Sequence, residues 1–424
     1  MMQLEDFARY FSLSDDVKDF ILQHGYGQIS DHLSCVPDSL SDEFILQQLQ
    51  KLRTPIEPAA LLEAAAELRS DPYLLSCFNL LDHYWFHTAS PLMYGSKLPE
   101  YNMNPNGKAH AGIYYLLNAL ACFPVIRQNY AALGVPEQYA LDTVQYLSGA
   151  IQEYAAGNDE KLGISGRKLH WFSFYVQGKL FRIGRFEYMI QDPLNYLPAA
   201  YRRKSDGKVI ALCRNGWQLD KNGYWLFTDE SPDQAYCIAT LQSSENSICG
   251  IPIDPRGFAE VDRRITLDLN EYTPLWNNWD LVPGLHIPGG GGMTPEACYD
   301  SLSRALEFFP RYFKRRVAAV SCFSWIFNPD FELELPESNV ARFMRQVYLF
   351  PFPSVGVEGL AFVFGKSDAD YTNYPADNSL RRAFHSLRQQ GKRLKAGGMF
   401  ITPEAVNNFG CSIYRQDHSA FESL

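Results

Sequence analysis

Residues 280–309 decide the fold of the second half of the chain. They read Asp-Leu-Val-Pro-Gly-Leu-His-Ile-Pro (280–288), then Gly-Gly-Gly-Gly-Met (289–293), then Thr-Pro-Glu-Ala-Cys-Tyr-Asp-Ser-Leu-Ser-Arg-Ala-Leu-Glu-Phe-Phe (294–309). The pattern predicts a strand, a glycine loop and a helix. Thr294 is a favoured N-cap, Pro295 suits the first helical position and Glu296 suits the first turn. Apolar residues then recur near helical spacing, which indicates a helix with one buried face.

The four consecutive glycines, Gly289, Gly290, Gly291 and Gly292, would let a ligand approach the backbone closely. The helix behind them offers unpaired amide donors and a partial positive charge, which together suit an anion such as a phosphate. A plain tight turn is the alternative interpretation. No Gly-Lys-Ser/Thr follows the run, and no spaced Gly-x-Gly-x-x-Gly opens the helix, so the P-loop and the dinucleotide-binding fingerprint lose support.

Length and composition bound the class of protein. A chain of 424 residues exceeds what one core comfortably fills, and 46% hydrophobic residues are ample for two domains. The nine cysteines show no CxxC or zinc-ligand spacing, which favours reduced thiols and a cytoplasmic location. The acidic start, Met-Met-Gln-Leu-Glu-Asp, is unlike a signal peptide. The apolar run 111–126 is too short to span a membrane, so no membrane association is expected.

Charge is distributed unevenly along the chain. Residues 1–160 hold 8 Lys and Arg against 20 Asp and Glu, and the remainder holds 30 against 28. This shift predicts a domain boundary near residue 160, with domains at 1–160 and 161–424. It also argues against nucleic acid as a partner of the first domain, because neutralising phosphates needs clustered basic residues.

Periodicity predicts an all-α first domain and an α+β second domain. Helices are expected at 43–49, 58–69, 73–87, 110–123 and 137–155. Strands are then expected at 168–176, 180–189, 208–213, 223–227, 261–269, 317–327, 357–365 and 397–402, with the first two forming a hairpin at Gln177-Gly178. Further helices are expected at 338–349 and 378–390.

The order of elements across residues 280–402 resembles the second half of the GNAT acyltransferase fold. The whole chain is similar to bacterial two-domain acyltransferases that have a helical N-terminal domain and a GNAT-like C-terminal domain. The residues that carry this resemblance are Gly178 to Arg185, Leu285-His286-Ile287-Pro288, and Ser324-Trp325 ahead of Pro336-Glu337-Ser338-Asn339.

The resemblance implies a mixed α/β C-terminal domain that binds acyl-CoA, acetyl-CoA or longer, as a co-substrate. The central strand, with Leu285 and Ile287, would pair with the pantetheine arm. The four glycines and Thr294 would hold the pyrophosphate, and Tyr348 would correspond to the tyrosine that protonates the leaving thiolate. Another pantetheine carrier, such as an acyl carrier protein, is the alternative donor.

Acyl transfer to an amine needs a base for the amine and an acid for the leaving thiolate. His286 lies where the strand meets the loop and is the candidate base or orienting group. Tyr348 is the candidate acid. A hydrogen-bonded core residue is the alternative interpretation for each of them. Ser321, Cys322 and Ser324 on the strand at 317–327 are candidates to line the acyl pocket.

We expect no metal, because His83 and His87 lack an identifiable third ligand. The function predicted is an N-acyltransferase that moves an acyl group from acyl-CoA to a small amine acceptor, whose site the helical domain helps to shape. The alternatives are a non-catalytic acyl-CoA or nucleotide sensor on the same fold and an interaction scaffold built on the acidic first domain.

Overall fold

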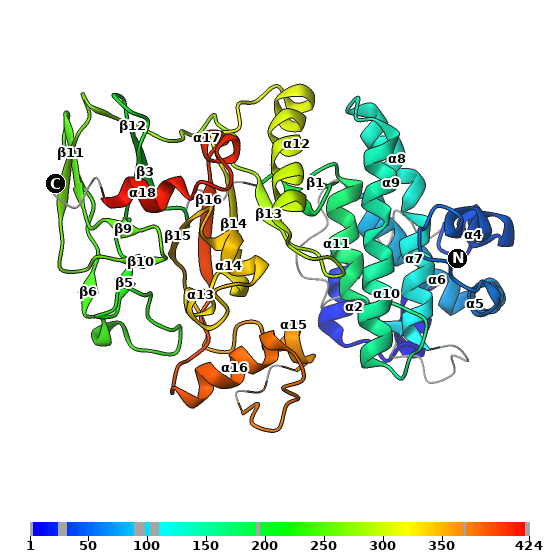
Figure 1. Cartoon of the computed structure of the whole chain (residues 1–424). Coiled ribbons are helices and arrows are strands. Elements are labelled where there is room, and N and C mark those ends of the chain that lie inside the picture. Colours follow the sequence, from blue (N-terminus) through cyan, green and yellow to red (C-terminus); the bar gives the residue numbers. More distant parts are fainter. Residues whose placement is uncertain are drawn as a thin grey trace. The chain divides into compact units, whose positions relative to one another are not determined.

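The computed structural model describes residues 3–23, 32–88, 98–101, 110–191, 196–366, 368 and 370–419. The chain separates into two compact units (Figure 1). Unit 1 holds residues 1–183 with 288–290, and unit 2 holds residues 184–287 with 291–424. Among the described residues, no helix combines the length and apolar character needed to cross a bilayer.

Unit 1 is helical, as predicted. Its α-helices are α1 (Leu4–Tyr10), α2 (Asp15–Gln23), α4 (Asp42–Leu49), α5 (Ala59–Ser70), α6 (Pro72–Asp82), α7 (Ala111–Ala121), α8 (Phe123–Ala132), α9 (Glu137–Val144), α10 (Tyr146–Gly157) and α11 (Arg167–Val176). A 3-10 turn at Asp38–Leu40 precedes α4, and a π-helical turn at His83–His87 continues α6.

Helix α7 lies at the centre of unit 1, because its residues from Gly112 to Ala121 are all buried. The one amide side chain in that stretch, Asn118, donates a hydrogen bond to the Phe78 carbonyl at 3.1 Å and accepts one from the Tyr101 hydroxyl at 3.0 Å. Burying an amide inside an apolar core is tolerated only when it is hydrogen-bonded in this way. The strand β1 (Leu180–Ile183) ends unit 1, and its Leu180 carbonyl accepts from the Tyr130 hydroxyl at 2.6 Å.

A mixed sheet forms the centre of unit 2. Its strands lie in the order β2 (Phe186–Met189), β13 (Gly284–His286), β14 (Val320–Ser324), β16 (Gly397–Ile401) and β15 (Tyr348–Pro351). All neighbours are antiparallel except β13 and β14, which run parallel. One helix, α12 (Pro295–Phe313), joins these two parallel strands.

Helix α12 packs on one face of the sheet. The buried residues of this helix follow the predicted helical spacing; they include Cys298, Ser301, Leu302, Ala305 and Phe309. The Ser301 hydroxyl anchors the helix to β2, because it accepts from the Phe186 amide at 3.1 Å and lies 3.0 Å from the Tyr188 hydroxyl.

Smaller elements complete unit 2 (Figure 1). Short antiparallel sheets are formed by β12 (Tyr272–Pro274), β3 (Ala199–Arg203) and β4 (Val209–Leu212); by β11 (Ile265–Asp268), β8 (Ser247–Gly250) and β7 (Gln242–Ser243); by β9 (Ile253–Asp254) and β10 (Phe258–Ala259); and by β5 (Gln218–Leu219) and β6 (Cys237–Ile238). The remaining helices are α13 (Asp330–Glu334), α14 (Asn339–Met344), α15 (Leu360–Phe364), α16 (Ser379–Gln389), α17 (Pro403–Asn407) and α18 (Ile413–Ser419), with 3-10 turns at Pro232–Gln234 and Trp325–Phe327.

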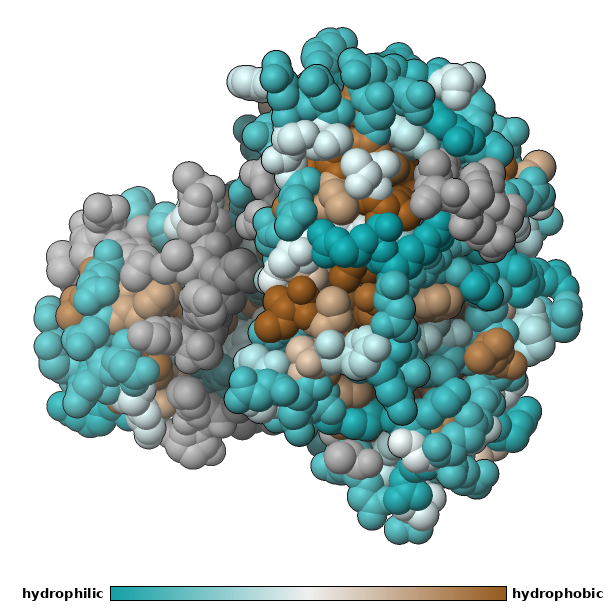
Figure 2. Space-filling model, turned by 90° about the vertical axis from the view of Figure 1, so that its left-hand side faces the viewer, coloured by the Kyte–Doolittle hydropathy of each residue, from teal (hydrophilic) through white to brown (hydrophobic). Residues whose placement is uncertain are grey.

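The surface over the small sheets is mainly polar. Figure 2 shows apolar residues on this side gathered in separate patches that hydrophilic residues interrupt. The exposed apolar side chains Tyr236 and Ile238 belong to this part of the chain.

Several predicted elements differ in the structure. The run 223–227 makes only isolated bridges, Trp225 with Leu219 and Phe227 with Ser354, and is not a strand. The run 168–176 is helix α11 rather than a strand, and its buried residues Leu169, Phe172 and Val176 fit a helical period that its aromatic composition obscured. The hairpin turn lies at Gly184-Arg185, between β1 and β2, whereas Gln177-Gly178 follows the end of helix α11. Gly178 and Gly184 both have a positive φ of 62°, so one glycine ends a helix and the other forms the hairpin turn.

The run 338–349 contains both a helix and a strand. Helix α14 ends at Met344, and Tyr348–Pro351 forms β15, which pairs with β16. The run 357–365 holds the short helix α15 instead of a strand. Gly359 and Gly365 bound it with φ values of 88° and 72°, which an L side chain rarely adopts and a regular strand excludes.

Candidate functional site

The two parallel strands of unit 2 part from each other beside the glycine loop. Before they part, the Ala318 amide donates to the Leu281 carbonyl at 3.0 Å, and the Ser321 amide donates to the Pro283 carbonyl at 3.0 Å. Gly284 then pairs with Ser321, and within the described residues β13 and β14 form no pair beyond this one. Strand β14 continues along β16 as far as Ser324.

The N–H and C=O groups of a strand alternate between its two edges, and this alternation determines which of them face the gap where β13 and β14 separate. Leu281 and Pro283 direct their carbonyls toward β14, as the two bonds above show. Successive residues of a strand point their N–H and C=O groups to opposite edges. Leu285 and Ile287 therefore direct theirs to the β14 side, where the paired register has ended. An extended ligand could be hydrogen-bonded by these groups.

A buried hydroxyl lies where the strands part. Ser321 is fully buried, and its hydroxyl has no hydrogen-bond partner among the described residues. Its strand neighbour Cys322 is also buried, and burial raises the pKa of that thiol well above its usual value. Cys322 is therefore a protonated thiol at neutral pH and not an activated nucleophile.

The glycine corner is open. Gly289, Gly290, Gly291 and Gly292 are all exposed, and a Cβ built at Gly289 or Gly290 would meet no atom within 4 Å. Only Gly290 requires glycine for its conformation, because its φ is 79°. Packing does not account for the other three glycines, whereas close approach of a ligand to the backbone would.

Arg185 fixes the second half of this loop. Its Nε donates to the Gly292 carbonyl at 2.9 Å, and its Nη2 donates to the Gly291 carbonyl at 2.8 Å. The arrangement engages two loop carbonyls and places a guanidinium beside the start of α12. In the sequence, Arg185 stands out only as the end of the stretch Gly178 to Arg185, which resembles the acyltransferase family. Nothing in its spacing from residue 291 predicted this contact across more than a hundred residues.

The start of α12 is as predicted. Thr294 is the N-cap, its hydroxyl accepts from the Ala297 amide at 3.3 Å, and Pro295 and Glu296 occupy the first turn. The helix has 19 residues, so its dipole contributes a partial positive charge at this end. Cys298, one turn further on, has its pKa raised to about 12 by burial.

His286 is the last residue of β13 and lies beside Glu187 in the register with β2. Burial of its imidazole lowers the pKa of His286 from 6.5 to about 4. A neutral ring is therefore the form present at pH 7. Such a ring can accept a proton or a hydrogen bond without first losing a proton of its own.

Tyr348 is placed inside the core rather than at a ligand surface. The residue is completely buried on β15, and its ring stacks on Phe400 with centroids 4.8 Å apart. Its hydroxyl donates to the Ile253 carbonyl at 2.5 Å and accepts from the Ala211 amide at 3.2 Å. Burial raises the pKa of this hydroxyl well above its usual value. This geometry gives Tyr348 a structural role and does not present it to a leaving thiolate.

Replacing Tyr348 by Phe tests that role. The change leaves the Ala211 amide and the Ile253 carbonyl without their shared partner, so unit 2 should lose about 1–3 kcal/mol of stability. Denaturant melts would measure the loss. If the variant instead kept its stability and lost release of CoA from acyl-CoA, Tyr348 would be the acid that the sequence suggested.

One group of potential metal ligands comes together within the described residues. Ligand atoms of Asp254, Glu260 and His418 lie within 4.8 Å of one another. Arginines already hold both carboxylates, since Arg256 Nη2 lies 2.5 Å from Asp254 and Arg263 Nη1 lies 2.8 Å from Glu260. The cluster is thus better suited to an internal ion network that anchors α18 through His418 than to a cation.

Comparison with known proteins identifies the family of the C-terminal part. Residues 180–400 match the model of the family described as the GNAT-like C-terminal domain. No curated protein matches the chain.

Solved structures share the fold over nearly the whole length. One is an acyltransferase in complex with CoA and 10C-teicoplanin, with a TM-score of 0.59 and 17% identity. Another is an acyltransferase mutant in complex with octanoyl-CoA, with a TM-score of 0.58 and 18% identity. Each comparison covers 95% of this chain and 99% of the other. Because the family match spans more than half of the chain, the protein belongs to the family with a GNAT-like C-terminal domain.

Proposed function

We propose that the protein is an N-acyltransferase that moves an acyl group from acyl-CoA to a small amine acceptor. The amine nitrogen bonds to the thioester carbonyl carbon, the carbon–sulfur bond breaks, and the proton lost by nitrogen passes to the CoA sulfur. The domain boundary near residue 160, a cytoplasmic location, and the independence from metal, membrane and nucleic acid remain predictions that accompany this proposal.

The observation that carries the proposal is the parting of β13 from β14 beside an open glycine corner. The groups of Leu285 and Ile287 that face the parting suit the amides of a pantetheine arm. The exposed glycines, Thr294 and the start of α12 suit a pyrophosphate at the end of that arm. One extended cofactor would use both features, which a free phosphate would not.

The bound molecules of the similar structures support the choice of donor. Those structures are complexes with CoA, octanoyl-CoA or decanoyl-CoA, and two of them also hold teicoplanin or 10C-teicoplanin. We infer a CoA thioester as the donor for this chain, with an acyl carrier protein as the alternative carrier. The acceptor is proposed only as a small molecule that carries an amine.

His286 is the candidate group for handling the proton. It stands at the end of β13, next to the backbone groups proposed to hold the donor, and its pKa of about 4 keeps it neutral. We propose that it accepts a hydrogen bond from the attacking amine and helps its proton move to sulfur.

Acyl-CoA should stabilise the protein. At a hundredfold excess over the dissociation constant, binding to the folded state alone contributes about 2.7 kcal/mol, which corresponds to a rise in melting temperature of roughly 2–4 °C for a chain of this size. A thermal melt with acetyl-, octanoyl- and decanoyl-CoA measures this. Free adenosine, which lacks both the pantetheine arm and the pyrophosphate, is the control. No shift with any of the three thioesters would count against the proposal.

A sensor that binds acyl-CoA without turnover is the second candidate. It is favoured by Tyr348, whose hydroxyl is buried and bonded to the Ile253 carbonyl, and by the weak basicity of His286. Free thiol released from acyl-CoA in the presence of a panel of amines distinguishes the two. Binding with no release above the rate in buffer would favour the sensor.

A further inference from the structure

A cavity lies on the small sheets of unit 2. None of the residues that line it belongs to the glycine loop. It has a volume of about 300 Å³ and is bounded by strands β3 and β12 and by the segment after β12. The residues that line it are Ala199, Ala200, Tyr201, Arg214, Leu241, Pro274, Trp276, Asn277 and Asn278. Its volume is at the lower end of the range typical of small-molecule sites.

Arg214 gives this cavity a positive charge that has no ion-pair partner among the described residues. Its Nε donates to the Leu197 carbonyl at 2.5 Å, which holds one of its five N–H groups. No carboxylate within the described ranges forms an ion pair with it. The acid that follows the lining segment, Asp280, is already occupied by Arg316 at 2.6 and 2.8 Å. Burial lowers the pKa of Arg214, and Tyr201 partly offsets this, but an arginine stays charged at neutral pH.

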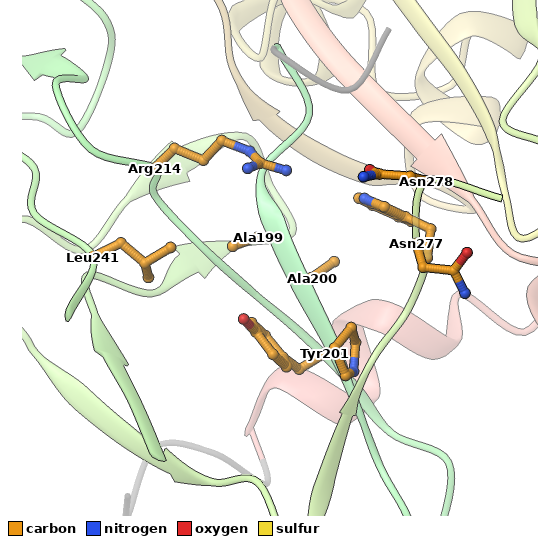
Figure 3. Close-up of a pocket in the computed structure, with 9 residues that line it drawn as sticks. Ala199, Ala200, Tyr201, Arg214, Leu241, Asn277 and Asn278 are labelled. Carbon is orange, nitrogen blue, oxygen red and sulfur yellow. The ribbon is translucent and has the colours of Figure 1, made fainter. Parts of the chain in front are cut away.

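Neutral donors also line the cavity. Burial raises the pKa of Tyr201, so its hydroxyl is protonated at neutral pH. The Asn277 oxygen is engaged by the Trp279 amide at 2.8 Å, and Figure 3 shows the Asn277 amide directed away from Arg214, whereas the Asn278 amide points toward it. Figure 3 shows Arg214 extending from one wall of the cavity toward the wall that carries Asn277 and Asn278.

The other lining groups are apolar. Trp276 and Tyr201 are buried, and Leu241, Pro274 and the two alanines complete the walls. The cavity therefore combines one unpaired cation with an apolar, partly aromatic lining. A carboxylate or phosphate can take two N–H groups of one guanidinium at once, and an apolar body would use the remaining walls.

We propose that this cavity binds the carboxylate or phosphate group of a small organic anion, with Arg214 as its charged partner. The site is separate from the glycine loop, and the proposal does not depend on acyl transfer. The anionic group would lie against the guanidinium and the Tyr201 hydroxyl, and its organic part would lie along Trp276.

Ligand-observed NMR titration of the full chain with phenylacetate and phenyl phosphate tests the proposal, with 2-phenylethanol as the neutral analogue. We expect saturable binding of at least one anion, and the preferred anion identifies the carboxylate or the phosphate as the natural group. Arg214→Gln should weaken that binding about tenfold or more, because a charge-assisted bidentate contact is lost. Tyr201→Phe, which removes one hydroxyl, should weaken it several-fold.

The matched control is Arg264→Gln, because Arg264 is an exposed arginine bonded to Thr240 and does not line the cavity. Its binding should equal that of the wild type. Three results would overturn the proposal: no saturable binding of either anion, equal binding of 2-phenylethanol, or unchanged binding in both Arg214→Gln and Tyr201→Phe. Loss of binding in Arg185→Gln but not in Arg214→Gln would place the anion at the glycine loop and would also overturn it.

Discussion

Replacing His286 by alanine is expected to lower acyl-CoA-dependent modification of an amine by about 10²- to 10⁴-fold, the usual contribution of a positioned proton-transfer group. Binding of acyl-CoA should change little, because the proposed contacts to the donor come from the backbone of Leu285 and Ile287 and from the glycine loop. The rate of thiol release measures the first effect. A thermal shift with the same thioester measures the second.

The pH dependence separates His286 from an ordinary surface histidine. Since its pKa is about 4, its ring is neutral from pH 5.5 to 8, and the rate should show no inflection from this group near 6.5. Activity attributable to His286 should fall only as the pH drops through about 4.

A matched control is His385→Ala on α16. The His385 Nε2 lies 3.1 Å from the Tyr374 carbonyl, on a helix outside the proposed donor site, and its removal should leave the rate unchanged. If His286→Ala retained full turnover, or if its removal abolished an inflection near pH 6.5, the role given to His286 would be refuted.

Local signals in the sequence predicted the part of the fold that positions the proposed donor site. The N-cap Thr294, Pro295 and the spacing of apolar residues fixed the start and the buried face of α12, because capping and amphipathicity act over a few residues. The glycine run predicted an open corner, and Gly289 and Gly290 have open space around them.

The sequence-based predictions were wrong where tertiary packing overrides the local preference of a segment for helix or strand. Tyr348 ended a plausible helical pattern, yet pairing of β15 with β16 makes it a strand residue whose hydroxyl joins Ala211 and Ile253 from distant segments. The spacing of apolar residues along the chain cannot predict hydrogen bonds to such distant segments. The same holds for Arg185, whose bonds to the glycine loop cross more than a hundred residues.

The Arg214 cavity was missed for a related reason. Its cation, its hydroxyl and its aromatic wall come from three separate segments, and none of them carries a motif. A lone arginine in sequence is usually a solvated surface residue. Only its burial and the lack of a neutralising carboxylate in the described chain distinguish it.

The second large effect concerns Asp330, which is buried at the start of α13. Lys392 and Lys395 each place their Nζ 2.8 Å from a different oxygen of its carboxylate. Burial alone would raise the pKa of Asp330, but the two lysines lower it below its ordinary value. The interaction joins α13 to the segment between α16 and β16, so it connects two elements that are distant in sequence.

Asp330→Asn should therefore destabilise unit 2 by about 2–3 kcal/mol, somewhat below the value for a fully buried pair because Lys392 is partly exposed. Hydrogen exchange of the amides in α13 and β16 should accelerate roughly 30- to 150-fold if they exchange through unfolding of this unit. Asp229→Asn, which removes an exposed partner of Arg393, is the control and should change stability by less than about 0.5 kcal/mol.

The dependence on pH has a defined sign. Because the folded pKa of Asp330 lies below its unfolded value, the carboxylate's contribution is complete above pH of about 4 and is lost as the pH falls through the folded value. The wild type should thus lose its advantage over Asp330→Asn in acid, and the two stabilities should converge. Equal stability of the two proteins at pH 7, or a stability difference that does not shrink at all as the pH falls below about 4, would show that the lysines do not hold this carboxylate in its charged form.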